Sequence, residues 1–186
     1  MLELKFDKFP VLETRRLILR QVQYYDVESM HWMRTDPAIM KYMDTELPKT
    51  ISDTQKKFEQ ELESFSKGDS VYWAIVLKKT NKFIGGAGFW RIIKEHYRAE
   101  IGYQLLPEYW RKGYSLEALI AIIQFGFKKM GLHSIEGNVN PKNIPSIKLL
   151  EKLGFKQEAY FKENFYYNGK FLDSAIFSLI ISDWKF

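Results

Sequence analysis

A strand-like run that leads through a glycine-containing loop into a helix-like run is the feature that most constrains this chain. From Arg98 to Leu105 apolar and polar residues alternate, as they do in a strand. From Leu116 to Met130 apolar residues recur at helical spacing, and Gly131 follows as a candidate left-handed residue that ends the helix. Ser115 has the side chain of an N-cap. The pattern predicts a strand, a short loop and a helix that begins close to Gly113.

The loop residues before this helix are suited to bind phosphate. The first turn of a helix leaves backbone N–H groups unpaired and carries the positive end of the helix dipole. Gly113 has no Cβ to keep a ligand away from the backbone. We therefore expect an anion site formed by Arg111, Lys112, Gly113, Tyr114 and Ser115. An ordinary surface turn with two cations is the alternative.

Two commoner phosphate motifs are absent. A P-loop needs Lys and Ser or Thr after its last glycine, whereas Tyr114 follows Gly113. The cluster Gly85-Gly86-Ala87-Gly88 has Arg91 where a dinucleotide fingerprint has its last glycine, and it lies inside a strand-like run. These glycines indicate a bulge or a tight backbone contact within a strand.

The composition is that of a folded protein with a mild basic excess. The 186 residues are 46% hydrophobic and 27% charged, with a formal charge of +5 and no cysteine. We expect a single domain over residues 1–186, in a reducing cytoplasm. Residues 1–12 have no signal-peptide pattern, no apolar run is long enough for a membrane span, and the three histidines are not spaced as metal ligands. The basic residues form no run, so nucleic-acid binding is not expected.

Other elements follow from their boundary signals. Ser52 and Gln55 form a capping-box pattern for a helix that Gly68 ends. Pro145 begins a short helix that ends at Gly154, and Asn168-Gly169 is a hairpin signal. The order of helices, an antiparallel meander, a β-α-β-α unit and a hairpin predicts an α+β fold with a mixed sheet. The expected strands cover residues 14–22, 71–77, 83–92, 98–105, 133–139, 156–167 and 170–182, and helices are expected from Asp26 to about Thr35 and from Pro37.

Glu100 is the first candidate for chemistry. Alternation places it with Gly102 and Gln104 on one face of its strand, and Ala99, Ile101, Tyr103 and Leu105 on the other. A carboxylate on a strand that leads to an anion site is a candidate reaction group. The alternative is a structural Glu paired with Arg98 or another cation. Glu136 on the next expected strand is a second candidate.

Several motifs together resemble the GNAT acetyltransferases, in order and spacing, from about Leu12 to Leu179. More narrowly, the chain resembles the RimJ/RimL type, which acetylates N-termini of ribosomal proteins. The resemblance implies a mixed, mostly antiparallel twisted sheet of about seven strands flanked by about four helices. The motifs are Ala99-Glu100-Ile101-Gly102-Tyr103-Gln104-Leu105, Trp110-Arg111-Lys112-Gly113-Tyr114-Ser115, Asn143-x-x-Ser146, Leu153-Gly154-Phe155, Leu12-Glu13-Thr14-Arg15-Arg16-Leu17-Ile18-Leu19-Arg20, and Asn168-Gly169 with Asp173.

The resemblance also implies a cosubstrate and residue roles. Backbone N–H groups from Arg111 to Ser115 would hold the pyrophosphate of acetyl-CoA, Leu105 would pair with the pantetheine amides, and Asn143 would contact the cosubstrate. The strand with Glu136 would splay from the strand with Glu100. Glu100 would be the general base, through a water, and Ser146 would protonate the CoA thiolate. Many family members have a Tyr four residues before the Gly-Phe pair for that last role, whereas this chain has Leu150, so a water is the alternative acid.

The acceptor is expected to be the α-amine of a protein or peptide N-terminus. A small amine such as an antibiotic, polyamine or amino acid is the alternative, as is an acyl-CoA-binding module without catalysis. The chain is also a candidate homodimer. An aromatic opening formed by Tyr25, Trp32, Tyr42, Met43, Phe165, Tyr166 and Tyr167 is expected to receive the acceptor.

Overall fold

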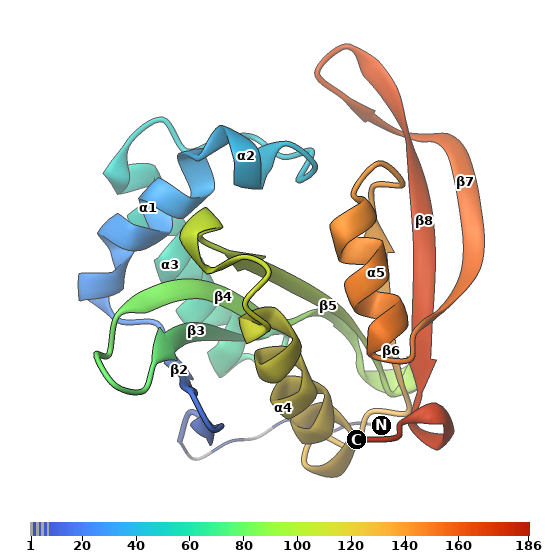
Figure 1. Ribbon diagram of the computed structural model, residues 1–186, viewed down its shortest axis with the longest axis horizontal. Helices are drawn as coiled ribbons and strands as arrows, with labels where there is room; N and C mark the ends of the chain where they lie inside the picture. Colours follow the sequence, from blue (N-terminus) through green and yellow to red (C-terminus); the bar gives the residue numbers. More distant parts are fainter. Residues whose placement is uncertain (1, 3, 5, 7) are drawn as a thin grey trace.

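The computed structural model describes residues 2, 4, 6 and 8–186, which form one eight-stranded sheet with helices on both faces (Figure 1). Met1, Glu3, Lys5 and Asp7, part of the stretch assessed for a signal peptide, lie outside the described residues. The strands are β1 (Leu12–Glu13), β2 (Leu17–Gln21), β3 (Val71–Leu77), β4 (Phe83–Ile93), β5 (Arg98–Leu105), β6 (Ser134–Val139), β7 (Lys156–Tyr167) and β8 (Lys170–Ile180). The helices are α1 (Val27–Thr35), α2 (Pro37–Met40), α3 (Ile51–Ser66), α4 (Tyr114–Lys128) and α5 (Ile144–Lys152).

The sheet confirms the predicted fold class. Its strand order is β1-β2-β3-β4-β5-β6-β8-β7, and every pair is antiparallel except β5 with β6. The expected meander is β3, β4 and β5, with Asn81 at φ +54° in its first turn. Asn168 and Gly169 both have positive φ in the turn between β7 and β8, as a two-residue hairpin of this type requires.

The glycine cluster lies in β4 and makes the close contacts that its sequence indicated. A Cβ on Gly86 would lie 2.0 Å from the hydroxyl oxygen of Tyr72, and one on Gly88 would lie 2.2 Å from the carbonyl oxygen of Val71. The register between β3 and β4 also shifts at Ile75 and Val76. The cluster therefore allows β4 to pack closely against β3, where a side chain on either glycine would not fit.

Two helix starts differ from the sequence prediction. The capping box of α3 is Thr50 with Asp53, because Thr50 has extended backbone and its side chain accepts from the N–H of Asp53. Ser52, predicted as the cap, is already helical. The N-cap of α4 is Gly113, since its φ of +77° makes the change of chain direction, so Ser115 lies inside the first turn.

The predicted first strand, residues 14–22, is shorter in the structure. Only β2 (Leu17–Gln21) lies within it, and Thr14, between the unpredicted β1 and β2, accepts a hydrogen bond from the N–H of Leu17. Asp26 precedes α1 as expected, but its carboxylate accepts from Gln23 N–H and Arg20 rather than from the helix.

The sheet separates two apolar cores. Ala99, Ile101 and Leu105 of β5 belong to the larger core, together with α4, as the alternation predicted. The smaller core joins α1 and α3 to the other face of β3 and β4. Glu100 and Gly102 therefore face the α1 and α3 side, while α4 and α5 cover the opposite face (Figure 1). No helix in the described part of the chain is long and apolar enough to cross a membrane.

Candidate active site

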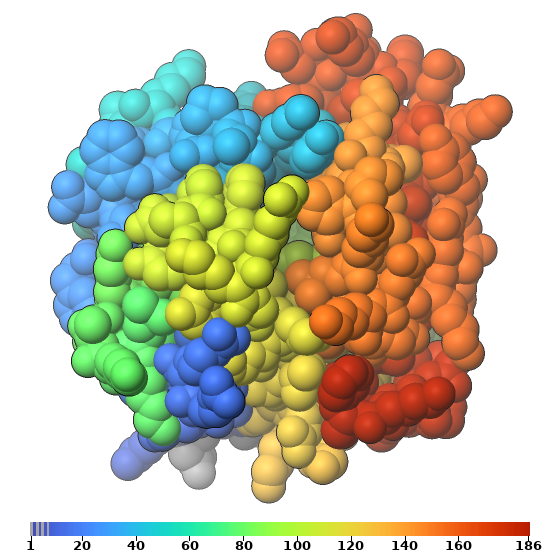
Figure 2. All heavy atoms as spheres, viewed as in Figure 1, coloured from blue at the N-terminus to red at the C-terminus, as the bar shows by residue number. Residues whose placement is uncertain are grey.

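The parallel strands β5 and β6 pair only at their beginnings and then separate. Their register contains Arg98 with Ser134, Ala99 with Ile135 and Glu100 with Glu136, and no later pair. From Ile101 to Leu105 the edge of β5 that faces β6 is left without a strand partner. Such an edge offers backbone N–H and C=O groups to an extended ligand that carries amides. Figure 2 shows a hollow on this face between the yellow-green residues ahead of α4 and the orange α5.

Glu100 lies at the point where the two strands part. Its side chain is buried, with 6% of the residue exposed. Burial raises the pKa of Glu100 to about 7, the guanidinium of Arg91 opposes this rise, and the charge of Glu136 adds to it. Its hydrogen-bond partner is Arg91, whose Nη1 lies 3.3 Å from Glu100 Oε2. A carboxyl group with a pKa near neutrality can both accept and release a proton at physiological pH.

The second candidate, Glu136, has a different environment. Arg98 donates to its carboxylate, and the same guanidinium reaches Ser178 Oγ at 3.5 Å. Arg98 is thus the partner of Glu136, and Glu100 is paired with Arg91 instead of Arg98. Glu136 is held in a structural ion pair, which leaves Glu100 as the carboxylate with the weaker and longer contact.

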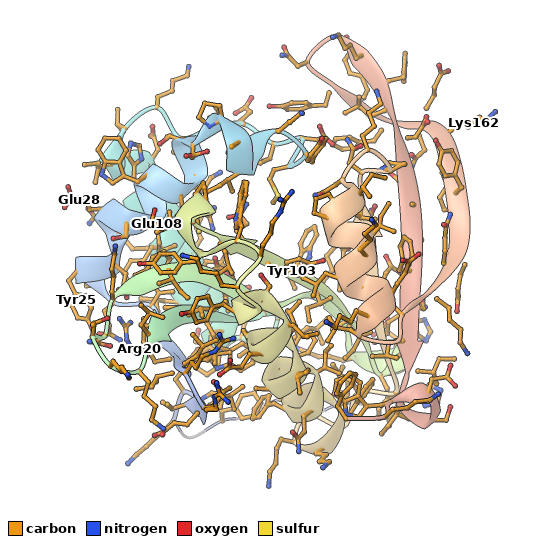
Figure 3. The ribbon with its side chains drawn as sticks, in the orientation of Figure 1. Arg20, Tyr25, Glu28, Tyr103, Glu108 and Lys162 are labelled. Carbon is orange, nitrogen blue, oxygen red and sulfur yellow. The ribbon has the colours of Figure 1, made fainter. Side chains whose placement is uncertain are left out.

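A hydroxyl pair joins the separated elements on the face of β5 opposite to Glu100. Tyr103 Oη on β5 lies 2.6 Å from Ser146 Oγ at the start of α5, and Tyr103 is labelled near the centre of Figure 3. Burial raises the pKa of Tyr103 to about 12, against the effect of the Ser146 hydrogen bond, so its phenol stays protonated. Leu150 is 2% exposed and packs on Gly137. The sequence placed Tyr103 on the apolar face and gave no sign of this hydroxyl contact.

The expected anion site lies at the N-terminus of α4. Arg111 has φ +57° and Gly113 has φ +77°, a local shape that turns successive N–H groups toward a common point. No side chain caps the first turn of α4, so its N–H groups stay available to a ligand. Arg111, Lys112 and Gly113 are exposed, and Tyr114 and Ser115 are half-buried. The loop therefore has the geometry of an anion-binding site, as the sequence predicted.

A polar network supports this loop from the N-terminal strands. Glu117 in the first turn of α4 accepts from Thr14 Oγ1 at 2.6 Å, Arg16 N at 2.7 Å and Arg16 Nε at 2.6 Å. Arg16 Nη1 donates to the carbonyl of Lys112 at 3.0 Å, and its guanidinium lies 4.2 Å from the ring centroid of Tyr114. Sequence reasoning noted Thr14 and Arg16 as a motif but missed their role, which only the tertiary contact reveals.

Asn143 and Leu105, which were also predicted to bind the cosubstrate, both make hydrogen bonds within the protein. Asn143 is the N-cap of α5, and its Oδ1 accepts from the N–H of Ser146 at 3.2 Å, so it holds Ser146 in place and keeps its amide N–H groups for a ligand. Leu105 ends β5 beside the loop, where its carbonyl accepts from Trp110 Nε1 at 2.7 Å.

The loop of residues 41–50 is joined to the β7–β8 hairpin and to the residue that follows β6. Tyr167 Oη donates to the carbonyl of Thr45 at 2.7 Å, and Asn140 Nδ2 donates to Asp44 Oδ2 at 3.0 Å. Tyr25 lies beside Arg20 on the opposite side of the molecule from Lys162 of the hairpin (Figure 3). The predicted aromatic set is therefore not one opening.

Comparison with known proteins agrees with this geometry. Residues 16–156 match the model of the protein family described as the acetyltransferase (GNAT) domain. The uncharacterized N-acetyltransferase YoaA of Bacillus subtilis is 32% identical over 172 residues, which cover 92% of this chain and 97% of that protein.

Two solved structures share the fold. The ribosomal-protein-S5-alanine acetyltransferase of Vibrio fischeri has a TM-score of 0.82 and 26% identity, and the alignment covers 95% of this chain and 99% of that one. The spermidine N-acetyltransferase of Vibrio cholerae, in complex with CoA and spermine, has a TM-score of 0.81 and 21% identity, with 91% and 98% coverage, and shows the fold alone. The chain belongs to the GNAT acetyltransferase family and is an acetyl-CoA-dependent N-acetyltransferase.

Proposed function

We propose that this enzyme acetylates the α-amine at the N-terminus of a protein or peptide, with Glu100 as the general base. The observation that carries the proposal is the buried Glu100 carboxyl with its pKa raised to about 7. An α-ammonium group has a pKa of about 8, whereas that of a Lys side chain is about 10.4. Proton transfer from an α-amine to Glu100 is thus nearly balanced, and from a lysine it is uphill.

Acetyl-CoA supplies an acetyl group as a thioester, which a neutral amine attacks directly. Glu100 takes the proton of the acceptor ammonium, through a water, so that the amine lone pair is free. Backbone N–H groups on the unpaired edge of β5 stabilise the negative charge that develops on the thioester oxygen. Ser146 donates a proton to the departing sulfur, and a solvent water returns a proton to Ser146. Tyr103 Oη, 2.6 Å from Ser146 Oγ, stays protonated and holds the hydroxyl in position.

Both backbone groups and side chains bind acetyl-CoA in this proposal. The N–H groups from Arg111 to Ser115 hold the pyrophosphate, and Arg111 and Lys112 add positive charge. The edge of β5 up to Leu105, whose own carbonyl already accepts from Trp110 Nε1, pairs with the pantetheine, and the Asn143 amide donates to it.

A small amine is the second candidate acceptor, since a spermidine N-acetyltransferase of Vibrio cholerae is 24% identical over 159 residues of this chain. At the proposed acceptor end, which is the 41–50 loop and the β7–β8 hairpin, Lys162 of β7 and Lys170 of β8 are balanced by acidic residues such as Asp44. The charges there do not single out a polycation.

The test is a panel of acceptors with acetyl-CoA, followed by release of the CoA thiol. The panel contains peptides with a free α-amine and no lysine, the same peptides with a blocked N-terminus and one internal lysine, and spermidine. We expect release with the free α-amines and little with the blocked peptides. Turnover of spermidine alone would contradict the proposed acceptor and leave the acetyltransferase assignment intact.

A further inference from the structure

A second polar cavity lies next to Glu100, on the α1 and α3 side of the sheet. Its volume is about 490 Å³, within the range of small-molecule sites. Its walls come from the end of α1, the middle of α3, the residues just before β3 and the end of β4. The acetyl-CoA site lies instead at the N-terminus of α4 and between β5 and β6, so this cavity is a separate space.

Two buried polar atoms of the cavity wall have no hydrogen-bond partner within the described part of the chain. Ser70 is only 5% exposed, and its Oγ is unpaired. Arg34 Nε is buried and unpaired as well. Burying a hydrogen-bonding group without a partner is unfavourable, and such groups are rare in folded proteins. Both atoms are donors, so they fit a ligand that brings acceptor oxygens.

Two charged side chains of α3 line the same cavity without an ion pair to another described residue. Burial raises the pKa of Glu61, with the charge of Arg34 opposing it. Lys57 lies one turn earlier on the same side of α3. In this order, with Lys before Glu, the two residues form the weaker arrangement of a helical pair. The cavity thus presents the Glu61 carboxylate, which the Arg34 charge influences, together with the Lys57 ammonium group, and neither forms an ion pair with a described residue.

We propose that this cavity binds a free amino acid as its zwitterion. Arg34 Nε–H, the Ser70 hydroxyl and Lys57 would receive the α-carboxylate. Glu61 would receive the α-ammonium, and the ligand side chain would lie against Trp90 and Ile92.

The charges of the wall select a zwitterion over simpler ligands. A plain anion would satisfy the donors but would be repelled by Glu61. A plain cation would pair with Glu61 and leave Lys57, Arg34 Nε and Ser70 Oγ unmatched. Only a ligand with both groups satisfies all four, and leaving either set unpaired costs binding.

The cavity also adjoins the reaction site through two residues of β4. Trp90 is the cross-strand partner of Glu100, and its indole nitrogen would lie 3.8 Å from a Cβ on Gly102. Arg91 lines the cavity and donates to Glu100. A ligand in the cavity therefore lies against the residues that flank the base.

The experiment measures binding directly, without acetyl-CoA, so its result does not depend on the proposed acceptor. Thermal stability of the whole protein is followed with each standard amino acid at about 10 mM, since a ligand of the folded state raises the melting temperature. For the amino acid with the largest shift, calorimetric affinity is compared with that of its amide, which is cationic, and its deamino acid, which is anionic. We expect the zwitterion to bind at least about tenfold more tightly than either. No shift with any amino acid, or equal affinity for all three forms, would overturn the proposal.

Variants locate the binding within the cavity. Ser70→Ala removes an unpaired hydroxyl, so we expect the ligand-free protein to be as stable as before while affinity falls about tenfold. Glu61→Gln should abolish the preference for the zwitterion over the deamino acid. Glu59→Gln is the control, because Glu59 is exposed on the same helix and contacts Gln55. Unchanged affinity in both Ser70→Ala and Glu61→Gln would contradict the assignment.

Discussion

The two ends of the active site are built from different materials. The cosubstrate end is a backbone structure, in which the loop before α4 is shaped by left-handed residues and held by the Glu117 network with Thr14 and Arg16. The proposed acceptor end is made of side chains on the 41–50 loop and the β7–β8 hairpin, which Tyr167 joins through Thr45; Asn140 after β6 also holds the loop, through Asp44. Nearly every residue of β7 is exposed.

This difference explains why acetyl-CoA can be inferred from the sequence and the acceptor cannot. A pyrophosphate presents the same oxygens to every family member, and backbone N–H groups are sufficient to bind it. An acceptor is distinguished by its own side chains, so the residues that contact it vary with the substrate. Substitutions at each end should therefore affect different kinetic constants. The largest loss of turnover is expected at Glu100, the proposed base between the two ends.

Glu100→Gln should lower turnover by about 10²- to 10⁴-fold, the usual contribution of a general base. Glutamine has nearly the same shape but cannot accept the proton. Affinity for acetyl-CoA, measured by calorimetry, should remain within about twofold, because Glu100 faces away from α4. Glu136→Gln is the comparison, with a smaller loss of turnover expected. An unchanged rate in Glu100→Gln near neutral pH would remove Glu100 from the role.

Gly113→Ala should raise the KM for acetyl-CoA about tenfold. An alanine at φ +77° costs about 1–2 kcal/mol, and its methyl group would lie 3.4 Å from Arg16 Nη2, beside the proposed pyrophosphate site. Gly131→Ala is the matched control, because Gly131 has φ +74° just after the other end of α4. It should lose similar stability with an unchanged KM. Equal KM values in the two variants would show that the loop does not bind the cosubstrate.

The sequence was sufficient for the parts that rest on local rules. Alternation placed Glu100 opposite Ile101, the bounds of β3 and β5 were predicted to the residue, and Asn168-Gly169 marked its hairpin. The N-cap of α4 could not be predicted from such rules. Ser115 and Gly113 are both residue types that occur at N-caps, and only the backbone angle of Gly113 identifies it as the cap.

Contacts between distant segments could not be read from the sequence. Arg91 reaches Glu100 only because the chain bulges after Trp90, and Arg91 itself has φ +46°. Tyr103 meets Ser146 because β5 and β6 separate. The two residues are nine apart in the first pair and 43 apart in the second, and no periodic pattern in the sequence indicates either contact.

Arg91→Gln should move the acidic limb of the pH profile of kcat/KM to higher pH. Activity requires the Glu100 carboxylate, whose pKa is about 7, so the rate rises through that pH in the native enzyme. Arg91 favours the carboxylate, and its removal raises the pKa further. At pH 6.5 we expect a loss of a few fold that vanishes near pH 9. Lys94→Gln is the control, since Lys94 pairs with Asp69, and an unmoved limb in Arg91→Gln would exclude coupling of Arg91 to the base.

Tyr167→Phe tests the acceptor end with the smallest expected effect. It removes only the hydroxyl that donates to Thr45, a hydrogen bond worth about 0.5–1.5 kcal/mol. We expect the KM for the acceptor to rise about two- to tenfold, with the KM for acetyl-CoA unchanged. Tyr166→Phe is the matched control, because Tyr166 is the adjacent residue and is 62% exposed. A rise in the KM for acetyl-CoA instead would mean that the 41–50 loop and the hairpin act on the cosubstrate end, and the division of the site into two independent ends would not hold.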